Sequence, residues 1–209
     1  MLFTTSPKDR AYERMMQQVP RYRWDTPNAD YYIGTYARYL HLTNTPATEN
    51  ALTIAAEITP WPILVMSIAE VFANPQFTRR AYNHYLKEDH YMTFINLSHQ
   101  LRFQSALIAN SMKNRIGQSA LYLLTADRDL WNRVSHHITE DGIHFGSMNI
   151  NGCSTDEYAL FCAAKDLYHC TRHITISDMA DHTVINGKLF CLICNAMTFA
   201  RYGIKALKE

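Results

Sequence analysis

The prolines of this chain are confined to its first part and mark where helices can begin. All seven prolines lie at or before Pro75 in a chain of 209 residues. Five of them follow a serine, threonine or asparagine, in the pairs Ser6-Pro7, Thr26-Pro27, Thr45-Pro46, Thr59-Pro60 and Asn74-Pro75. Proline suits the first helical position because its missing N–H would have no partner there, and the preceding side chain can cap an early amide. Each pair therefore predicts a helix start.

These starts and the spacing of apolar residues predict helices along most of the chain. The expected ranges are 7–18, 27–43, 46–58, 60–73, 75–87, 90–110, 113–124, 128–138, 154–170, a short helix after Ser177, and 188–202. The helix at Ser154 is predicted by a capping box, in which Ser154 and Glu157 satisfy each other's amides. We therefore expect an all-α fold, a compact multi-helix domain of about nine helices. At most one small β-hairpin is expected near 143–150, where Gly and Asn alternate with apolar residues.

The change in proline content suggests two regions. Residues 1–88 form a proline-punctuated helical region, and residues 89–209 form a helical region without proline. A charged junction at Lys87-Glu88 separates them. The sequence leaves open whether the two regions fold separately or share one continuous core.

The most apolar stretch of the chain runs from Ala51 to Asn74. It is interrupted by Glu57, Pro60, Pro62 and Glu70, so it falls short of the roughly 20 uninterrupted apolar residues that a membrane span needs. We interpret it as two buried helices, and we expect no membrane partner.

Charge and cysteine content bear on partners and location. Lys and Arg number 20 against 19 for Asp and Glu, a balance that argues against general nucleic-acid binding, although a local basic patch stays open. All five cysteines lie in the last third of the chain, and the first residues lack the basic-then-apolar order of an export signal. An odd, clustered set without such a signal is typical of reduced thiols in a cytoplasmic protein.

Three stretches of the second region carry a resemblance that spans about Asp89 to Arg201. They are residues 121–131 leading to His137-Ile138, residues 154–168 ending in Lys165-Asp166-Leu167-Tyr168, and Asn195-Ala196-Met197. Together they resemble an uncharacterised bacterial domain family that is common on mobile elements of Gram-positive bacteria. Family members carry Asn-Leu-Tyr where this chain has Asp166-Leu167-Tyr168, and the cysteines do not belong to the family pattern. The resemblance implies a genomic setting and no particular chemistry.

Two residue sets could hold a metal. On a continuous helix His137, Glu140, Asp141 and His144 would share one face and suit zinc or manganese, whereas Gly142 favours a polar helix end running into a loop. The second set is His169, His173, Cys191 and Cys194, which could close a tetrahedral zinc site between two helices. The alternative for the second set is that both cysteines pack as small apolar side chains, because they lie in an apolar helix.

A third candidate is an aromatic and basic surface in the first region. Its predicted protein-binding residues are Arg14, Tyr22, Trp24, Tyr32, Tyr36, Tyr39, Arg79, Arg80, Tyr82 and Tyr85. Tyr and Arg are enriched in protein-binding hot spots, and they also stack on single-stranded nucleic acid. The alternatives are ordinary solvated helix faces and, for the tyrosines at 31, 32, 36 and 39 on one predicted helix, core packing.

No nucleophile, phosphate-loop or dinucleotide motif occurs in the sequence, and no cofactor is predicted apart from the zinc alternative. The missing motifs and the Tyr- and Arg-rich helices favour a non-enzymatic protein-binding factor. The resemblance to a mobile-element family implies an accessory factor that binds a host or element protein, with inhibition of a host defence system such as a CRISPR effector as the specific hypothesis. The rival hypothesis is a small metal-dependent hydrolase or nuclease using His137, Asp141 and His144. Nucleic-acid binding through the Arg79-Arg80 helix is the least favoured hypothesis.

Overall fold

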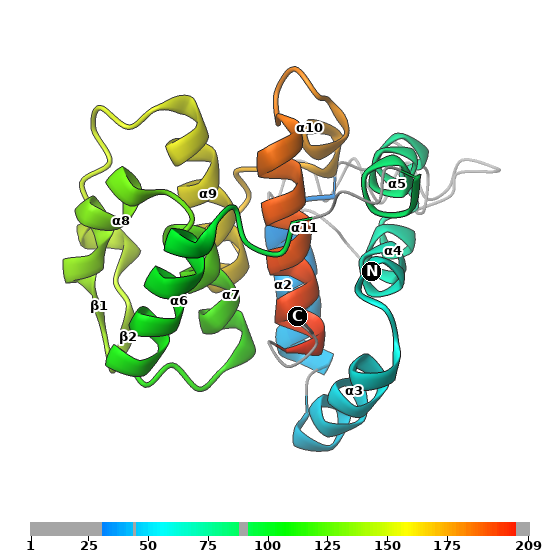
Figure 1. Cartoon of the computed structure of the whole chain (residues 1–209), viewed down its shortest axis with the longest axis horizontal. Helices are drawn as coiled ribbons and strands as arrows, with labels where there is room; N and C mark the ends of the chain where they lie inside the picture. The colour runs from blue at the N-terminus through cyan, green and yellow to red at the C-terminus, as the bar shows by residue number, and fades with distance from the viewer. Residues whose placement is uncertain (1–30, 44, 88–91, 204–209) are drawn as a thin grey trace, which may run out of the picture.

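Helix α11 stands in the middle of the molecule, with helices on both of its sides (Figure 1). The computed structural model describes residues 31–43, 45–87 and 92–203. The helices in these residues are α2 (Ile33–Thr43), α3 (Pro46–Ile58), α4 (Trp61–Val71), α5 (Pro75–Tyr82), the π-helix η1 (Asn83–Lys87), α6 (Leu97–Ala109), α7 (Arg115–Leu124), α8 (Arg128–Val134), the 3₁₀ turns η2 (Ser135–His137) and η3 (Phe145–Ser147), α9 (Thr155–His169), α10 (Ile176–Ala180) and α11 (Gly187–Tyr202).

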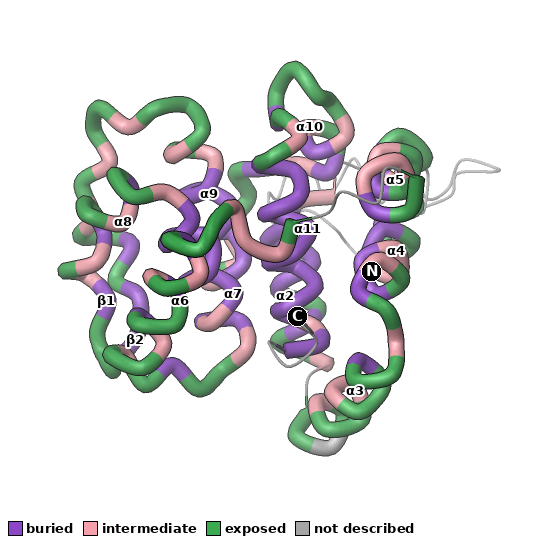
Figure 2. The backbone as a smooth tube through the Cα atoms, in the orientation of Figure 1, coloured by how far each residue is buried: buried purple, intermediate pink, exposed green. Residues whose placement is uncertain are grey.

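The apolar sequence of α11 explains its central position. Residues 189–194 are buried on every side of the helix, as Figure 2 shows by its continuous purple tube. A helix that is apolar all round needs neighbours on all sides. Helices α7 and α9 pack on one side of α11, α3 and α4 pack on the other, and α2 contacts both α11 and α9. The buried residues form one cluster that includes side chains from both sides of α11.

The predicted all-α fold with one small hairpin is confirmed within the described residues. The hairpin lies slightly earlier than expected: strand β1 (Ile138–Thr139) pairs antiparallel with β2 (Gly142–Ile143). Helix α8 therefore ends at Val134 rather than near 138. Gly142 has a φ of 137°, a backbone conformation that other residues rarely adopt, and this residue lets the chain turn back on itself.

Local capping explains most of the helix starts. The side chains of Thr45 and Asn74 accept bonds from early amides of α3 and α5, and the Ser154–Glu157 capping box opens α9, all as predicted. The prediction for Thr59-Pro60 is wrong in detail, because α4 begins at Trp61 with no side-chain cap. The pairs at Pro7 and Pro27 lie outside the described residues.

Helix α2 begins later than the predicted range, at Ile33. Tyr32 is extended and forms an isolated antiparallel bridge with Thr175. The Ile33 amide donates to the carbonyl oxygen of Ile174 at 3.1 Å. At Tyr31 and Tyr32, where the described residues begin, backbone pairing with the segment after α9 therefore takes the place of the expected helix. Helix α6 also starts late, at Leu97 rather than near 90.

Helix α3 is not the buried helix that the apolar stretch predicted. Of its apolar side chains, Ala56 is 1% exposed, whereas Ile54 is 64% and Ile58 is 83% exposed. One face packs on α11, and the opposite face meets solvent although it is also apolar. Helix α4 is buried as expected along the side that carries Leu64 and Ile68. In the described part of the chain, no helix combines the length and the apolar character that crossing a membrane requires.

Candidate functional site

The structure divides the predicted protein-binding residues into buried and exposed sets. Tyr36 is 3% exposed, and its hydroxyl donates to the Met197 carbonyl oxygen at 3.1 Å. Tyr85 is 1% exposed, and its hydroxyl lies 3.0 Å from both the Cys191 carbonyl oxygen and Asn195 Oδ1. Both rings therefore belong to the core and do not lie on an exposed surface.

Arg80 is also held within the fold. Its guanidinium donates to the carbonyl oxygens of Met179 and Ile185 at 2.8 and 2.5 Å, and it lies 4.4 Å from the centre of the Phe190 ring. It thus joins α5 to α10 and α11. Tyr32 lies in the backbone bridge with Thr175, and Arg172 stacks over its ring at 5.8 Å. The predicted residues Arg14, Tyr22 and Trp24 lie outside the described residues.

The remaining predicted residues, Tyr39, Arg79 and Tyr82, face solvent. Arg79 and Tyr82 are two of a set of exposed, mostly apolar side chains on α3, α4, α5 and the following π-helix η1. We name this set the outer α3–α5 face and define it by Ile54, Ile58, Ile63, Val71, Arg79, Tyr82 and Leu86. Its apolar members are exposed by 64, 83, 48, 47, 51 and 41% for Ile54, Ile58, Ile63, Val71, Tyr82 and Leu86 respectively.

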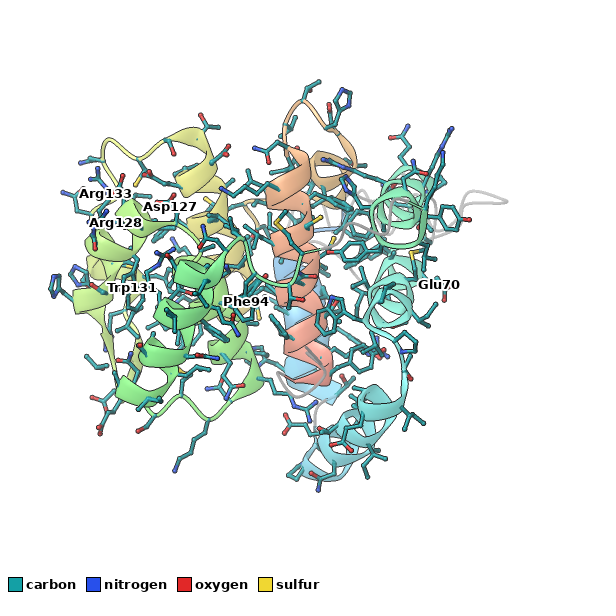
Figure 3. All side chains as sticks on the ribbon, viewed as in Figure 1. Glu70, Phe94, Asp127, Arg128, Trp131 and Arg133 are labelled. Carbon is teal, nitrogen blue, oxygen red and sulfur yellow. The ribbon has the colours of Figure 1, made fainter. Side chains whose placement is uncertain are left out.

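Charge on the outer α3–α5 face is sparse and of both signs. Arg79 is its one charged member, and Glu57, Glu70 and Lys87 are exposed charged residues on the same helices. Figure 3 shows Glu70 on the outer side of α4, at the opposite end of the molecule from Arg128 and Arg133. Large exposed apolar surfaces on soluble proteins commonly mark interaction sites. Sequence reasoning found Arg79 and Tyr82 but missed the isoleucines, because the apolar stretch on which they lie predicted burial.

The predicted metal set near the hairpin is not assembled. His137 Nδ1 lies 2.9 Å from the Ser147 hydroxyl, His144 Nε2 lies 3.2 Å from the Thr139 hydroxyl, and Asp141 is in the hairpin turn. The residues do not share a helix face because the chain leaves the helical conformation before Ile138. Across residues 31–43, 45–87 and 92–203, no three His, Cys, Asp or Glu side chains are grouped to hold a metal ion.

The second predicted metal set is also dispersed. His173 Nδ1 lies 2.7 Å from Asp166 Oδ1, whereas the ring of His169 packs against Phe145. Cys191 and Cys194 are 5% and 2% exposed, and burial raises the pKa of the Cys194 thiol, which favours the uncharged form. All five cysteines are free thiols. Cys191 and Cys194 therefore serve as small apolar side chains in the core of this structure.

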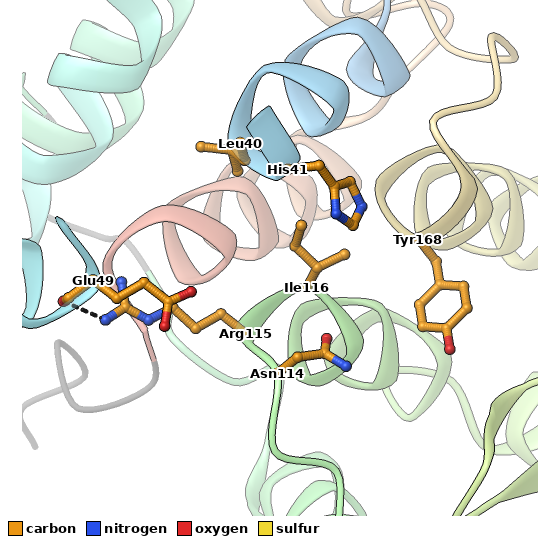
Figure 4. Close-up of a pocket in the computed structure, with 7 residues that line it drawn as sticks. All are labelled: Leu40, His41, Glu49, Asn114, Arg115, Ile116 and Tyr168. Atoms are coloured by element: carbon orange, nitrogen blue, oxygen red, sulfur yellow. Dashed lines mark hydrogen bonds between the residues drawn. The ribbon is translucent and has the colours of Figure 1, made fainter. Parts of the chain in front are cut away.

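A cavity of about 250 Å³ lies between α2, α3, α7 and α9 (Figure 4). Its lining residues are Leu40, His41, Glu49, Asn114, Arg115, Ile116 and Tyr168. The Arg115 guanidinium already donates to the carbonyl oxygens of Arg201 and Glu49 and to the Thr53 hydroxyl, at 2.7, 2.5 and 2.6 Å. These hydrogen bonds connect α7 to α3 and to the end of α11. The donors of Arg115 are therefore already used within the fold.

Two further hollows are also lined by polar residues that bond within the fold. One, of about 420 Å³, shares Asn114 and Tyr168 with the first, and Asn114 caps α7 through the Gly117 amide. The other, of about 390 Å³, is lined by Asp127 and Ser154, which cap α8 and α9. Because Asn114, Arg115, Asp127 and Ser154 in these hollows already bond within the fold, we place the candidate functional site on the outer α3–α5 face instead.

The buried side chain of His99 makes the free energy of unfolding depend on pH. His99 is 0% exposed, its Nδ1 accepts from the Ile95 amide at 3.4 Å, and its Nε2 donates to the Tyr122 carbonyl oxygen at 3.0 Å. This arrangement requires the neutral ring. Burial lowers the pKa of His99 from 6.5 to about 4, with the Tyr122 carbonyl opposing the shift.

We expect the free energy of unfolding to fall as the pH drops from 6.5 toward 4, because the unfolded chain takes up a proton at His99 that the folded chain resists. At pH 4.5 this group lowers stability by about 2 to 3 kcal/mol relative to pH 7.5. Urea unfolding at both pH values measures the loss in the wild type and in His99→Gln. The variant is less stable at pH 7.5 but loses less on acidification; an equal loss in both proteins would contradict the assignment.

In comparisons with models of protein families, with curated proteins and with solved structures, nothing matches this chain.

Proposed function

We propose that this chain is a non-enzymatic protein-binding factor and that the outer α3–α5 face is its docking surface. The observation that carries the proposal is the exposure of six large apolar side chains on α3, α4, α5 and η1. Burying a fully exposed isoleucine or leucine side chain is favourable by about 1.5 to 3 kcal/mol, so such a surface gains free energy when a partner covers it.

The composition of the face favours a protein partner. Tyr82 and Arg79 lie three residues apart on α5 and face the same way, and Leu86 follows in η1. Tyr and Arg are among the residue types most enriched in binding hot spots. The sparse charge of both signs argues against a nucleic-acid partner, which would need a basic surface.

The partner class rests on the resemblance to a family of mobile elements. A host protein or a protein of the element is the proposed partner, and a defence protein such as a CRISPR effector is the specific candidate. Binding that blocks such a protein needs no catalytic group. It needs a surface that competes with the partner's own contacts.

The experiment is capture of proteins by the tagged full-length chain from a lysate of a related bacterium with active defence systems, followed by affinity measurements with the purified partner. Tyr82→Ala and Ile58→Glu are each expected to weaken binding by at least about tenfold, as for hot-spot residues. Tyr158→Ala is the matched control, because Tyr158 on α9 is 51% exposed, as is Tyr82. The proposal fails if no stoichiometric partner is captured, or if both variants bind the partner as well as the control does.

A further inference from the structure

Helix α6 carries a second apolar surface, far along the chain from the outer α3–α5 face. Its inward side, with His99, Phe103 and Ala106, is buried, and the helix packs against α7 (Figure 1). Its outward side carries Leu97, Leu101 and Ile108, which are 67, 53 and 82% exposed, and also the exposed Gln104. We name Leu97, Leu101, Gln104 and Ile108 the α6 stripe.

The spacing within the α6 stripe is symmetric. Successive members are separated by four, three and four residues, so the pattern is the same when it is followed in either direction. An antiparallel second copy of α6 would therefore place Leu97 opposite Ile108 and Leu101 opposite Gln104. By symmetry, each of these pairs would occur two times in the interface. Alternation of four and three residues is also the spacing by which helices pack side by side in coiled coils.

The charge of α6 suits self-association. Arg102 is the only charged residue that α6 contains, and its guanidinium donates to the carbonyl oxygens of Thr125 and Ala126 at 2.9 and 3.3 Å. Two copies of the stripe consequently meet without facing like charges, which would oppose association. Near the two-fold axis the Gln104 amides of the two copies can bond to each other, and a polar residue in an apolar seam selects one register.

We propose that the α6 stripe is the interface of an antiparallel dimer of this chain. The helix has 13 residues and is about 20 Å long, so the interface is small and we expect a weak dimer. This proposal concerns a surface that the proposed function does not use, and either can fail alone.

The test is analytical ultracentrifugation of the full-length chain across a range of concentrations. The wild type is expected to show a monomer–dimer equilibrium, which Ile108→Glu weakens by at least about 30-fold because the glutamate enters the seam twice. Ile58→Glu is the matched control: Ile58 is 83% and Ile108 is 82% exposed, so both variants carry the same surface change. The combination L97K with I108E is expected to restore association, since each lysine then faces a glutamate of the other copy.

Cross-linking tests the direction of pairing. In one chain residues 97 and 108 are about 16 Å apart along the helix, too far for a disulfide, so oxidation of L97C with I108C forms a disulfide between residue 97 of one chain and residue 108 of the other only when the chains are antiparallel. Leu97→Cys alone then forms no additional cross-link beyond the wild type. A wild type that stays monomeric, a dimer lost in Ile58→Glu but kept in Ile108→Glu, or efficient cross-linking of the single variant would each overturn the proposal.

Discussion

Replacing Asn195 by leucine lowers the free energy of unfolding by about 3 to 4 kcal/mol, because this one side chain connects several buried polar groups. Asn195 is 0% exposed and lies in the middle of α11. Its Oδ1 accepts from Trp61 Nε1 and from the Tyr85 hydroxyl, both at 3.0 Å. Its Nδ2 donates to the Met92 carbonyl oxygen at 2.8 Å and to the Tyr122 hydroxyl at 3.3 Å.

The four groups that bond to Asn195 do not all lose their hydrogen bonds to the same extent in this variant. The hydroxyl of Tyr85 keeps the Cys191 carbonyl and that of Tyr122 keeps the Thr93 carbonyl, whereas the Trp61 N–H loses its acceptor in a site that is 7% exposed. An unsatisfied buried donor costs about 1 to 3 kcal/mol. Urea unfolding followed by circular dichroism measures the change in the free energy of unfolding that Asn195→Leu causes.

Thr198→Val is the control for the asparagine variant. Thr198 is also 0% exposed on α11, but its hydroxyl bonds only to the Cys194 carbonyl oxygen of the same helix, at 2.8 Å. We expect it to cost about 1 kcal/mol. In addition, N195L combined with W61F should cost less than the sum of the single changes, since the second removes the donor that the first leaves unpaired. Strict additivity would show that the network is not the source of the effect.

Replacing Asp166 by alanine is expected to cost a similar amount, about 3 to 5 kcal/mol, because a buried carboxylate organises the segment that follows α9. Asp166 is 0% exposed. It accepts from the Thr171 hydroxyl at 2.7 Å, the His173 amide at 3.0 Å, His173 Nδ1 at 2.7 Å and the Ile174 amide at 2.9 Å. Alanine leaves all these donors without their acceptor.

The consequence of the Asp166 change extends to α2. The ordered segment places Ile174 and Thr175 for their backbone pairing with Ile33 and Tyr32, so its loss loosens the start of α2. Hydrogen exchange is expected to rise in residues 171–176 and 32–36 together, alongside a lower urea midpoint. Asp156→Ala is the control, since Asp156 is exposed and bonds only to the Asn186 side chain. Unchanged exchange in both segments would contradict this role.

The sequence predicted the features that are decided within a few residues. The Ser154–Glu157 capping box and the Asn74 cap depend on neighbours along the chain, and both form as expected. The position of the hairpin depended on where α8 stops, which no local signal marked except Gly142.

Features decided by distant contacts could not be predicted in the same way. Helical spacing places Tyr36 and Tyr39 near one another on α2, but it does not say which points inward; packing buries Tyr36 and leaves Tyr39 48% exposed. The two apolar faces of α3 look alike in sequence, and only the position of α11 decides which one remains exposed. The bonds of Asn195 and Asp166 likewise depend on partners brought together by the whole fold.

The central position of α11 has a consequence for synthesis on the ribosome. α11 is translated after every other described helix, yet α3, α4, α7 and α9 all pack against it. At a translation rate of about 5 to 20 residues per second, α11 is synthesised roughly 5 to 30 seconds after α3 and α4, and their apolar sides stay uncovered during that time. During that interval the nascent chain exposes Trp61 and Leu64 as well as its permanently exposed isoleucines. We expect this chain to depend on chaperones that shield nascent polypeptides, and slower translation before α11 to reduce its soluble yield.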